Sequence, residues 1–100
     1  MMLTNEKVLE VFKPFFDADD TYEVVMTSRG YTLLNGEDGQ SEWDQATMCP
    51  TPEKLRDALL DGYCRYLTYL AHKDDLARDL TVEEKRRIEE MRKAVADRCR

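Results

Sequence analysis

Residues 51–73 read TPEKLRDALLDGYCRYLTYLAHK, and this stretch decides the fold that the sequence predicts. Thr51 can cap free helix N–H groups, Pro52 suits the first helical position, and Glu53 opposes the positive end of the helix dipole. Apolar residues then recur at three- and four-residue steps, which predicts a long helix with one wide apolar stripe. The stripe comprises Leu55, Leu59, Tyr63, Tyr66 and Leu70, widened by Ala58, Gly62, Leu67 and Ala71 and flanked by Leu60 and Cys64. Because a stripe this wide needs two neighbours, we expect the rest of the chain to cover it.

Gly62 is the unusual residue of this predicted helix. A glycine in a helix interior costs about 1 kcal/mol relative to alanine. Its presence indicates either that another element approaches closely at this point or that the cost is simply tolerated, and the sequence leaves both interpretations open.

A first helix is predicted to begin after Thr4, a good N-cap residue. Pro14 lacks a backbone donor and clashes with the preceding turn, so we expect this helix to kink or end near Phe12, with Phe16 outside it. A short acidic run follows, which we interpret as a solvated connector made of Asp17, Ala18, Asp19 and Asp20.

The next segment predicts a β-hairpin. YEVVMTS (22–28) and YTLLN (31–35) alternate with period two around Arg29-Gly30, so we expect a tight antiparallel turn in which Gly30 has a positive φ. The residues expected to share the core face are Tyr22, Val24, Met26, Tyr31 and Leu33. SEWDQATM (41–48) can add a third strand and place Trp43 beside the hairpin, so the sequence allows a two- or a three-stranded meander.

A last helix is predicted from Thr81, which has the spacing of a capping box with Glu84. Its apolar positions form a narrow seam suited to antiparallel packing on the long helix: Val82, Ile88, Met91, Val95 and Cys99. The predicted architecture is therefore α+β, a single domain over residues 1–100 with an N-terminal helix, an antiparallel meander, a long central helix and a C-terminal helix that completes a helical pair.

Length and composition limit the class of protein. The chain has 100 residues, of which 42% are hydrophobic, enough for one modest core. It shows no apolar run near 18 residues and no signal-peptide pattern at its start, so we expect a cytoplasmic protein without a membrane span. The cysteines, Cys49, Cys64 and Cys99, are odd in number and lack a CxxC pair, which favours reduced thiols.

Few residues in the sequence suggest catalytic chemistry. His72, the one histidine, lies beside Lys73 near the end of the long helix, where a solvated or dipole-stabilised imidazole is the expected state. Together with the three cysteines it matches no zinc-ligand spacing. No Ser-His or Cys-His motif and no glycine-rich phosphate loop occurs. We expect a non-catalytic protein with no metal or cofactor.

The charge distribution is uneven. The net charge is −6, yet residues 1–84 hold 8 basic and 18 acidic side chains, whereas residues 85–100 hold 7 basic and 3 acidic ones. A negative body disfavours direct nucleic-acid binding, since phosphates attract basic surfaces. Tyr63, Tyr66 and Tyr69 have the spacing of a base-stacking platform, but helical spacing favours core and rim packing, with Tyr69 the most exposed. A simple solubilising role for the carboxylates stays equally open.

One resemblance bears on function. EKLRDALLDGY (53–63), together with the predicted order of elements, resembles the central helix of small phage-encoded anti-CRISPR proteins that block Cas9. The resemblance implies a DNA mimic, a phage or mobile-element inhibitor whose carboxylates occupy arginine sites built for phosphate. The basic last helix departs from the all-acidic surface of that pattern. The residues expected to make the contact are Asp17, Asp19, Asp20, Glu37, Asp38, Glu42 and Asp44.

Two functional hypotheses follow. The first is a non-catalytic, acidic protein-binding module that binds the basic groove of a nucleic-acid enzyme such as Cas9. The second is an oligomerising structural or adaptor protein whose C-terminal helix pairs with a partner helix. For the second we expect a weak, salt-sensitive homodimer, because the basic end of that helix can pair with the acidic body of another copy.

Overall fold

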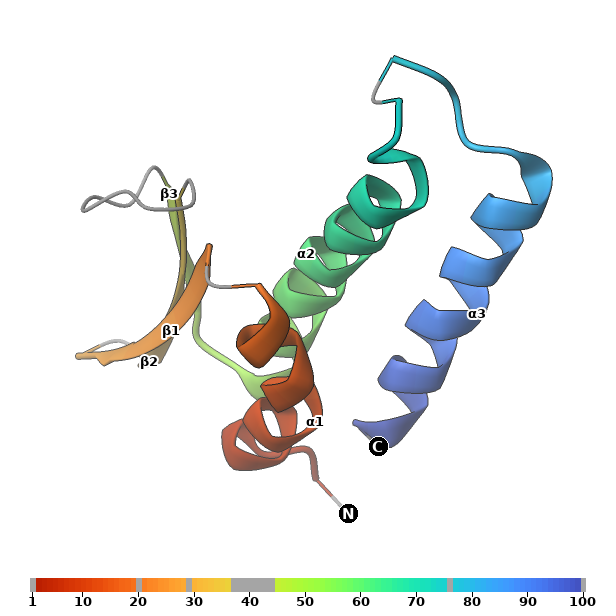
Figure 1. The fold of residues 1–100 in the computed structure, drawn as a ribbon. Coiled ribbons are helices and arrows are strands. Elements are labelled where there is room, and N and C mark those ends of the chain that lie inside the picture. The colour runs from red at the N-terminus through yellow and green to blue at the C-terminus, as the bar shows by residue number, and fades with distance from the viewer. Residues whose placement is uncertain (1, 20, 29, 37–44, 76, 100) are drawn as a thin grey trace.

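The computed structural model describes residues 2–19, 21–28, 30–36, 45–75 and 77–99. Its elements follow one another as α1 (Asn5–Ala18), β1 (Tyr22–Thr27), β2 (Gly30–Asn35), β3 (Gln45–Cys49), α2 (Pro52–His72) and α3 (Val82–Arg98). The predicted α+β class is confirmed. α2 runs through the middle of the molecule, with the sheet on one side and α3 antiparallel to it on the other (Figure 1).

α2 begins and ends where the sequence predicts. The Thr51 hydroxyl accepts a hydrogen bond from the Lys54 amide at 3.2 Å, and Pro52 opens the helix. The side chains that this helix buries most fully are Leu55, Leu59, Leu60 and Leu67. Leu70 is an exception to the predicted stripe because it is 38% exposed, near the end of α2 that extends past the sheet.

The structure decides the question that Gly62 left open. A Cβ placed on this residue would lie 3.0 Å from Cε1 and 3.1 Å from Cζ of Tyr22, the first residue of β1. Contacts this short are rare for a real Cβ, so the missing side chain lets the sheet approach the helix. The glycine is therefore a packing residue.

α1 corrects the prediction made for its end. The helix continues through Pro14 to Ala18, so Phe16 and Asp17 are helical and do not belong to a connector. Phe15 explains why, because it is 4% exposed and its ring centroid lies 5.3 Å from that of Tyr22. Burying such a side chain contributes about 1.5–3 kcal/mol, which offsets the roughly 3 kcal/mol cost of an interior proline.

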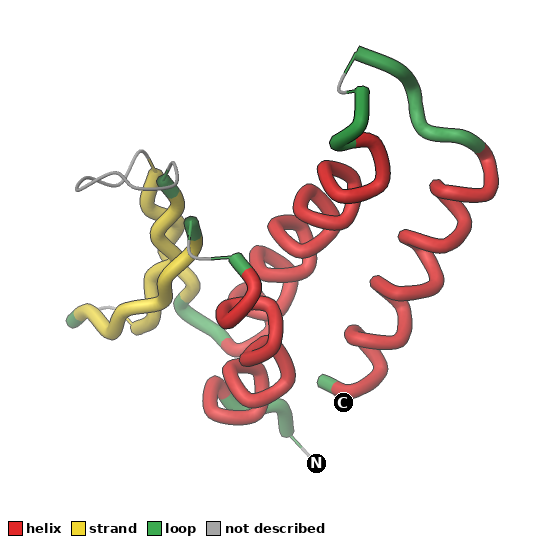
Figure 2. The backbone as a smooth tube through the Cα atoms, in the orientation of Figure 1, coloured by secondary structure: helices red, strands yellow, loops and turns green. Residues whose placement is uncertain are grey.

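The sheet is a three-stranded antiparallel meander in the order β1-β2-β3 (Figure 2). β1 pairs with β2 from Tyr22 opposite Asn35 to Thr27 opposite Gly30, and Gly30 has the predicted positive φ, 108°. β3 confirms the third strand, while Trp43 lies outside the described residues. Met26 belongs to the predicted core face but is 70% exposed, since it lies near the hairpin tip, away from the helices.

One hydrophobic core joins α1, β2 and α2. Its members include Val8, Phe12, Leu33, Leu55 and Leu59. Cys99, directly after α3, also lies in this core, although no residue within α3 itself is buried. The predicted seam of α3 is therefore only half covered, and Val82 at its first position is almost fully exposed.

Candidate functional site

The structure describes two of the seven carboxylates predicted to bind a partner. Asp17 is exposed on α1, with one oxygen 3.3 Å from Nζ of Lys13. Asp19 follows α1, and its Oδ1 accepts hydrogen bonds from the Thr21 amide at 3.0 Å and the Thr21 hydroxyl at 2.6 Å. This carboxylate thus fixes the turn into β1. The prediction for the other five lies outside the described residues: Asp20, Glu37, Asp38, Glu42 and Asp44.

A shallow groove of about 550 Å³ runs between α1 and β1. Its apolar surface is formed by the half-buried side chains of Leu9, Phe16 and Val24. Charged residues line it as well, four of them acidic: Glu6, Glu10, Lys13, Asp17 and Glu23. The α1 members recur at three- and four-residue steps, so they lie along one face of the helix. We call this feature the α1–β1 groove.

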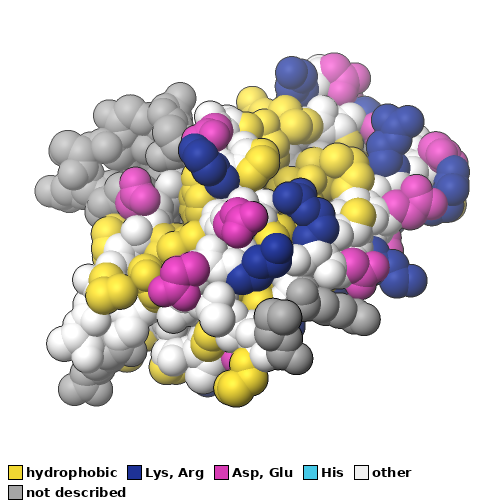
Figure 3. All heavy atoms as spheres, turned by 90° about the horizontal axis from the view of Figure 1, so that it is seen from below, with side chains coloured by type: hydrophobic (Ala, Val, Ile, Leu, Met, Phe, Trp, Pro, Cys, Tyr) yellow, Lys and Arg dark blue, Asp and Glu magenta, His cyan; other side chains and the backbone are white. Residues whose placement is uncertain are grey.

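The α1–β1 groove carries negative charge that no ion pair between described residues neutralises. Glu6, Glu10 and Glu23 form no ion pair with any residue in the described ranges. On α3, by contrast, Arg86 pairs with Glu83 and Glu90, and Arg92 pairs with Glu89. Figure 3 shows acidic side chains beside apolar surface toward the side of the sheet, with basic side chains among them, and basic and acidic side chains closely mixed over the opposite side.

The free edge of β1 borders this groove. β1 pairs only with β2 in the described sheet, so its other edge is open. The Val24 amide donates a hydrogen bond to Oε1 of Glu23 at 3.1 Å. In an antiparallel strand alternate amides point away from the paired neighbour, and Glu23 occupies one such outward donor. A charged residue on an edge also discourages pairing with another strand.

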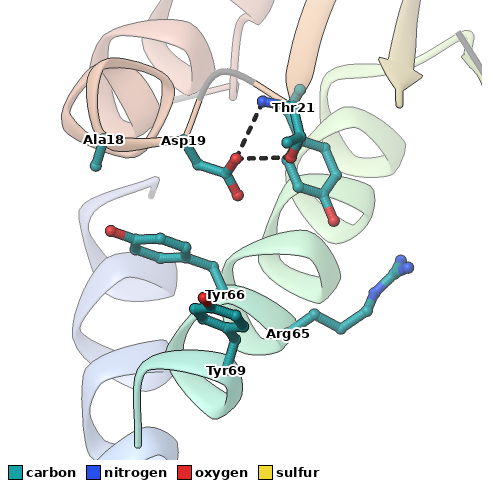
Figure 4. A pocket seen from close by; sticks show the side chains of 7 residues that line it. Ala18, Asp19, Thr21, Arg65, Tyr66 and Tyr69 are labelled. Carbon is teal, nitrogen blue, oxygen red and sulfur yellow. Dashed lines mark hydrogen bonds between the residues drawn. The ribbon is translucent and has the colours of Figure 1, made fainter. Parts of the chain in front are cut away.

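A second hollow, of about 440 Å³, lies where α1, β1 and α2 meet. Tyr66 and Tyr69 of α2 form an aromatic wall, and Asp19 and Thr21 lie opposite them, joined by their hydrogen bonds (Figure 4). Tyr69 is 52% exposed, as predicted. Arg65 also lines this hollow, but its guanidinium is 2.5 Å from Asp61. Desolvation raises the pKa of Tyr22 here, opposed by the positive charge of Arg65. The hollow offers aromatic faces and hydroxyl groups, with its charged groups already engaged.

The thiols and the histidine are held apart from these surfaces. Burial raises the pKa of Cys49, Cys64 and Cys99, and all three are free. A low thiolate fraction follows, which makes them poor nucleophiles. Nδ1 of His72 lies 3.1 Å from the Arg78 carbonyl oxygen, so in this contact it carries the proton and donates. Within the ranges that the structure describes, no three His, Cys, Asp or Glu side chains are placed to hold a metal ion.

Arg78 is the structural residue that the sequence did not single out. Its guanidinium donates to the Ala71 carbonyl oxygen at 2.8 Å and to both carboxylate oxygens of Glu84, at 2.9 and 3.0 Å. Glu84 also accepts from the Thr81 amide at 2.8 Å, which completes the predicted capping box. Arg78 therefore ties the end of α2 to the start of α3. Residues 76–80 read LARDL, a short sequence without a clear helical or strand pattern, so the sequence does not indicate such a role for Arg78.

The sequence also carried a signal for the α1–β1 groove. Glu6, Glu10 and Asp17 recur on one helical face, beside Leu9 and Phe16. The expected kink or end of the helix near Phe12 concealed the continuation of that face past Pro14.

None of the family models, curated proteins or solved structures compared with the chain matches it. No helix in the described part of the chain is both long and apolar enough to cross a membrane.

Proposed function

We propose that this chain is a non-catalytic, acidic protein-binding module that binds a basic protein surface of a nucleic-acid enzyme and competes there with phosphate. The observation that carries the proposal is the set of exposed, unpaired carboxylates beside apolar surface, Glu6, Glu10 and Glu23. Charge that no described residue neutralises is available to arginine and lysine side chains of a partner. The resemblance of residues 53–63 to anti-CRISPR proteins favours a partner such as Cas9, whose groove reads DNA with arginine side chains.

Binding to enzymes with arginine-lined DNA grooves tests this proposal. Cas9 with its guide RNA and several unrelated DNA-binding enzymes are immobilised, and binding is measured from about 50 mM to about 200 mM salt. We expect binding to at least one of them that weakens with salt and is lost when duplex DNA competes. Binding that duplex DNA leaves unchanged, or no binding to any member at low salt, contradicts the proposal.

A second candidate function is the oligomeric adaptor. The observation that favours it is the half-covered apolar seam of α3. Met91 on this seam is 39% exposed, and no residue of α3 is buried. Arg86 and Arg92 are already paired within α3, whereas its other described basic residues form no ion pair there and stay available to a second copy: Lys85, Arg87, Lys93 and Arg98. Sedimentation at low and high salt separates the two candidates: a salt-sensitive dimer through α3 favours the adaptor, and a monomer at both favours the binding module.

A further inference from the structure

We infer that the α1–β1 groove is the docking site and that its occupant is a basic amphipathic helix of the partner protein. The inference rests on the proposed function and adds the place of binding and the form of the partner. It commits to a protein segment with apolar side chains along one stripe and lysine or arginine on either side.

The groove has the dimensions of a helix contact. Its lining on α1 extends from Glu6 to Asp17, which is eleven steps of about 1.5 Å, or roughly 16 Å. That length matches about three turns of a partner helix, which present apolar residues at three- and four-residue steps. Leu9, Phe16 and Val24 offer a discontinuous apolar surface of the kind that such a stripe covers.

The charges select a basic partner. Glu6 and Glu10 lie on α1 and Glu23 lies on β1, so unpaired carboxylates flank the apolar surface from both elements. A partner helix with lysine or arginine on both sides of its apolar stripe can reach the carboxylates of α1 and of β1 at once. Lys13 contributes one positive charge, but it lies 3.3 Å from Asp17, so this pair is close to neutral. An acidic or uncharged helix would leave the three carboxylates without a positively charged partner.

A helix fits better than an added strand. A strand pairing with the free edge of β1 needs its outward N–H groups, and the Val24 amide already donates to Glu23. Displacing the Glu23 carboxylate costs its hydrogen bond to the Val24 amide. It also places the negative charge of Glu23 against the backbone of the added strand. A helix satisfies its own backbone groups and leaves this contact intact.

The test uses a fluorescent amphipathic peptide made of leucine and lysine, with a leucine and glutamine peptide as control. The full-length protein is compared with two triple variants that each remove three negative charges. The groove variant is Glu6→Gln, Glu10→Gln and Glu23→Gln. The matched variant is Glu53→Gln, Asp75→Asn and Asp79→Asn, which changes exposed carboxylates elsewhere and, like the first, alters one residue in the first turn of a helix.

We expect the groove variant to bind the lysine peptide about tenfold more weakly and the matched variant less than about twofold more weakly. Exposed charge pairs contribute about 0.2–1 kcal/mol each, and tenfold corresponds to about 1.4 kcal/mol. The glutamine peptide should bind weakly to all three proteins. Circular dichroism checks that both variants fold.

A second pair of variants tests the apolar surface. Leu9→Gln changes the groove, and Val25→Gln changes the partly exposed outer face of β1, on the other side of the sheet from Val24. We expect only Leu9→Gln to weaken peptide binding. The inference is overturned if the wild type does not bind the lysine peptide. It is also overturned if the two triple variants lose the same affinity for this peptide, or if the two single variants do.

The remaining outcomes separate this inference from the proposed function. If the groove variant keeps DNA-competed binding to an arginine-groove enzyme, the groove is not the docking site while the proposed function holds. If the wild type binds the lysine peptide through the groove but no such enzyme, the proposed function fails alone. If sedimentation shows that the wild type forms a dimer which the peptide dissociates, the occupant is a second copy and the inference is wrong.

Discussion

The half of the molecule that contains α1, the sheet and most of α2 differs from the half that contains α3 in what stabilises it. In the first half Val8, Phe12, Leu55 and Leu59 are buried almost completely. Within α3 no residue is buried, and the helix is supported by a capping box, by ion pairs along its surface and by Arg78. Full burial stabilises the first half, whereas α3 combines the partial packing of Val95 and Ala96 on the core with hydrogen bonds and charges.

This difference has a consequence for function. Within α3, Arg86 and Arg92 form ion pairs with glutamates of the same helix. α1 is held mainly by the burial of its apolar face. Glu6 and Glu10 form no ion pair within the described ranges, so their charge is available to a partner.

The largest expected effect is the loss of a core side chain. Leu59 is 0% exposed, and shortening it in Leu59→Ala leaves a cavity between α2 and its neighbours. We expect the free energy of unfolding to fall by about 2–5 kcal/mol, measured by urea denaturation. Leu67→Ala changes another buried position of this helix, one that is 8% exposed, and its cost should fall at the lower end of that range.

Leu70→Ala is the matched control for this comparison, since Leu70 lies on the same helix and is 38% exposed. We expect it to cost less than about 1 kcal/mol. Similar losses for Leu59→Ala and Leu70→Ala would contradict a core centred on the first half of α2.

A smaller effect should appear in α3 as the pH falls. Hydrogen bonds from Arg78, and then from the Thr81 backbone, lower the pKa of Glu84 to about 2 from 4.5. The folded state therefore binds this proton less readily than the unfolded state, so the stabilisation is fully present above about pH 4.5 and is lost as the pH falls toward about 2. The protection of α3 amides, measured relative to their intrinsic exchange rate at each pH, should fall in this window before that of the core.

Two variants sharpen this pH experiment. In Glu84→Gln, α3 should exchange faster at neutral pH and respond less to acid, because the ionisable group is gone. Glu53→Gln, in the first turn of α2, should keep the wild-type profile of α3. If Glu84→Gln keeps that profile as well, the Arg78 and Glu84 contact does not support α3.

The sequence predicted most of the fold because local signals determined it. Thr51, Thr4 and Thr81 each cap a helix as expected, and Gly30 takes the positive φ that its turn requires. These features depend on residues within four positions of one another. Composition and periodicity are sufficient to recognise them.

The parts that were predicted wrongly depend on distant residues. Pro14 was expected to kink or end α1 near Phe12, but the helix continues to Ala18, and Phe15 contacts Tyr22, Tyr63 and Tyr66 from later elements. Because α1 continues, its charged face extends to Asp17 and the α1–β1 groove forms. The role of Arg78 likewise depends on Ala71 and Glu84, which meet only when the two helices pack.

Residue-resolved amide exchange with and without the leucine and lysine peptide tests the central claim most directly, because it observes both halves of the molecule at once. The account predicts slower exchange in α1 and β1 when the peptide is bound and no change in α3. Slower exchange confined to α3, or spread evenly over the acidic surface, would contradict the claim that the half stabilised by burial binds the partner.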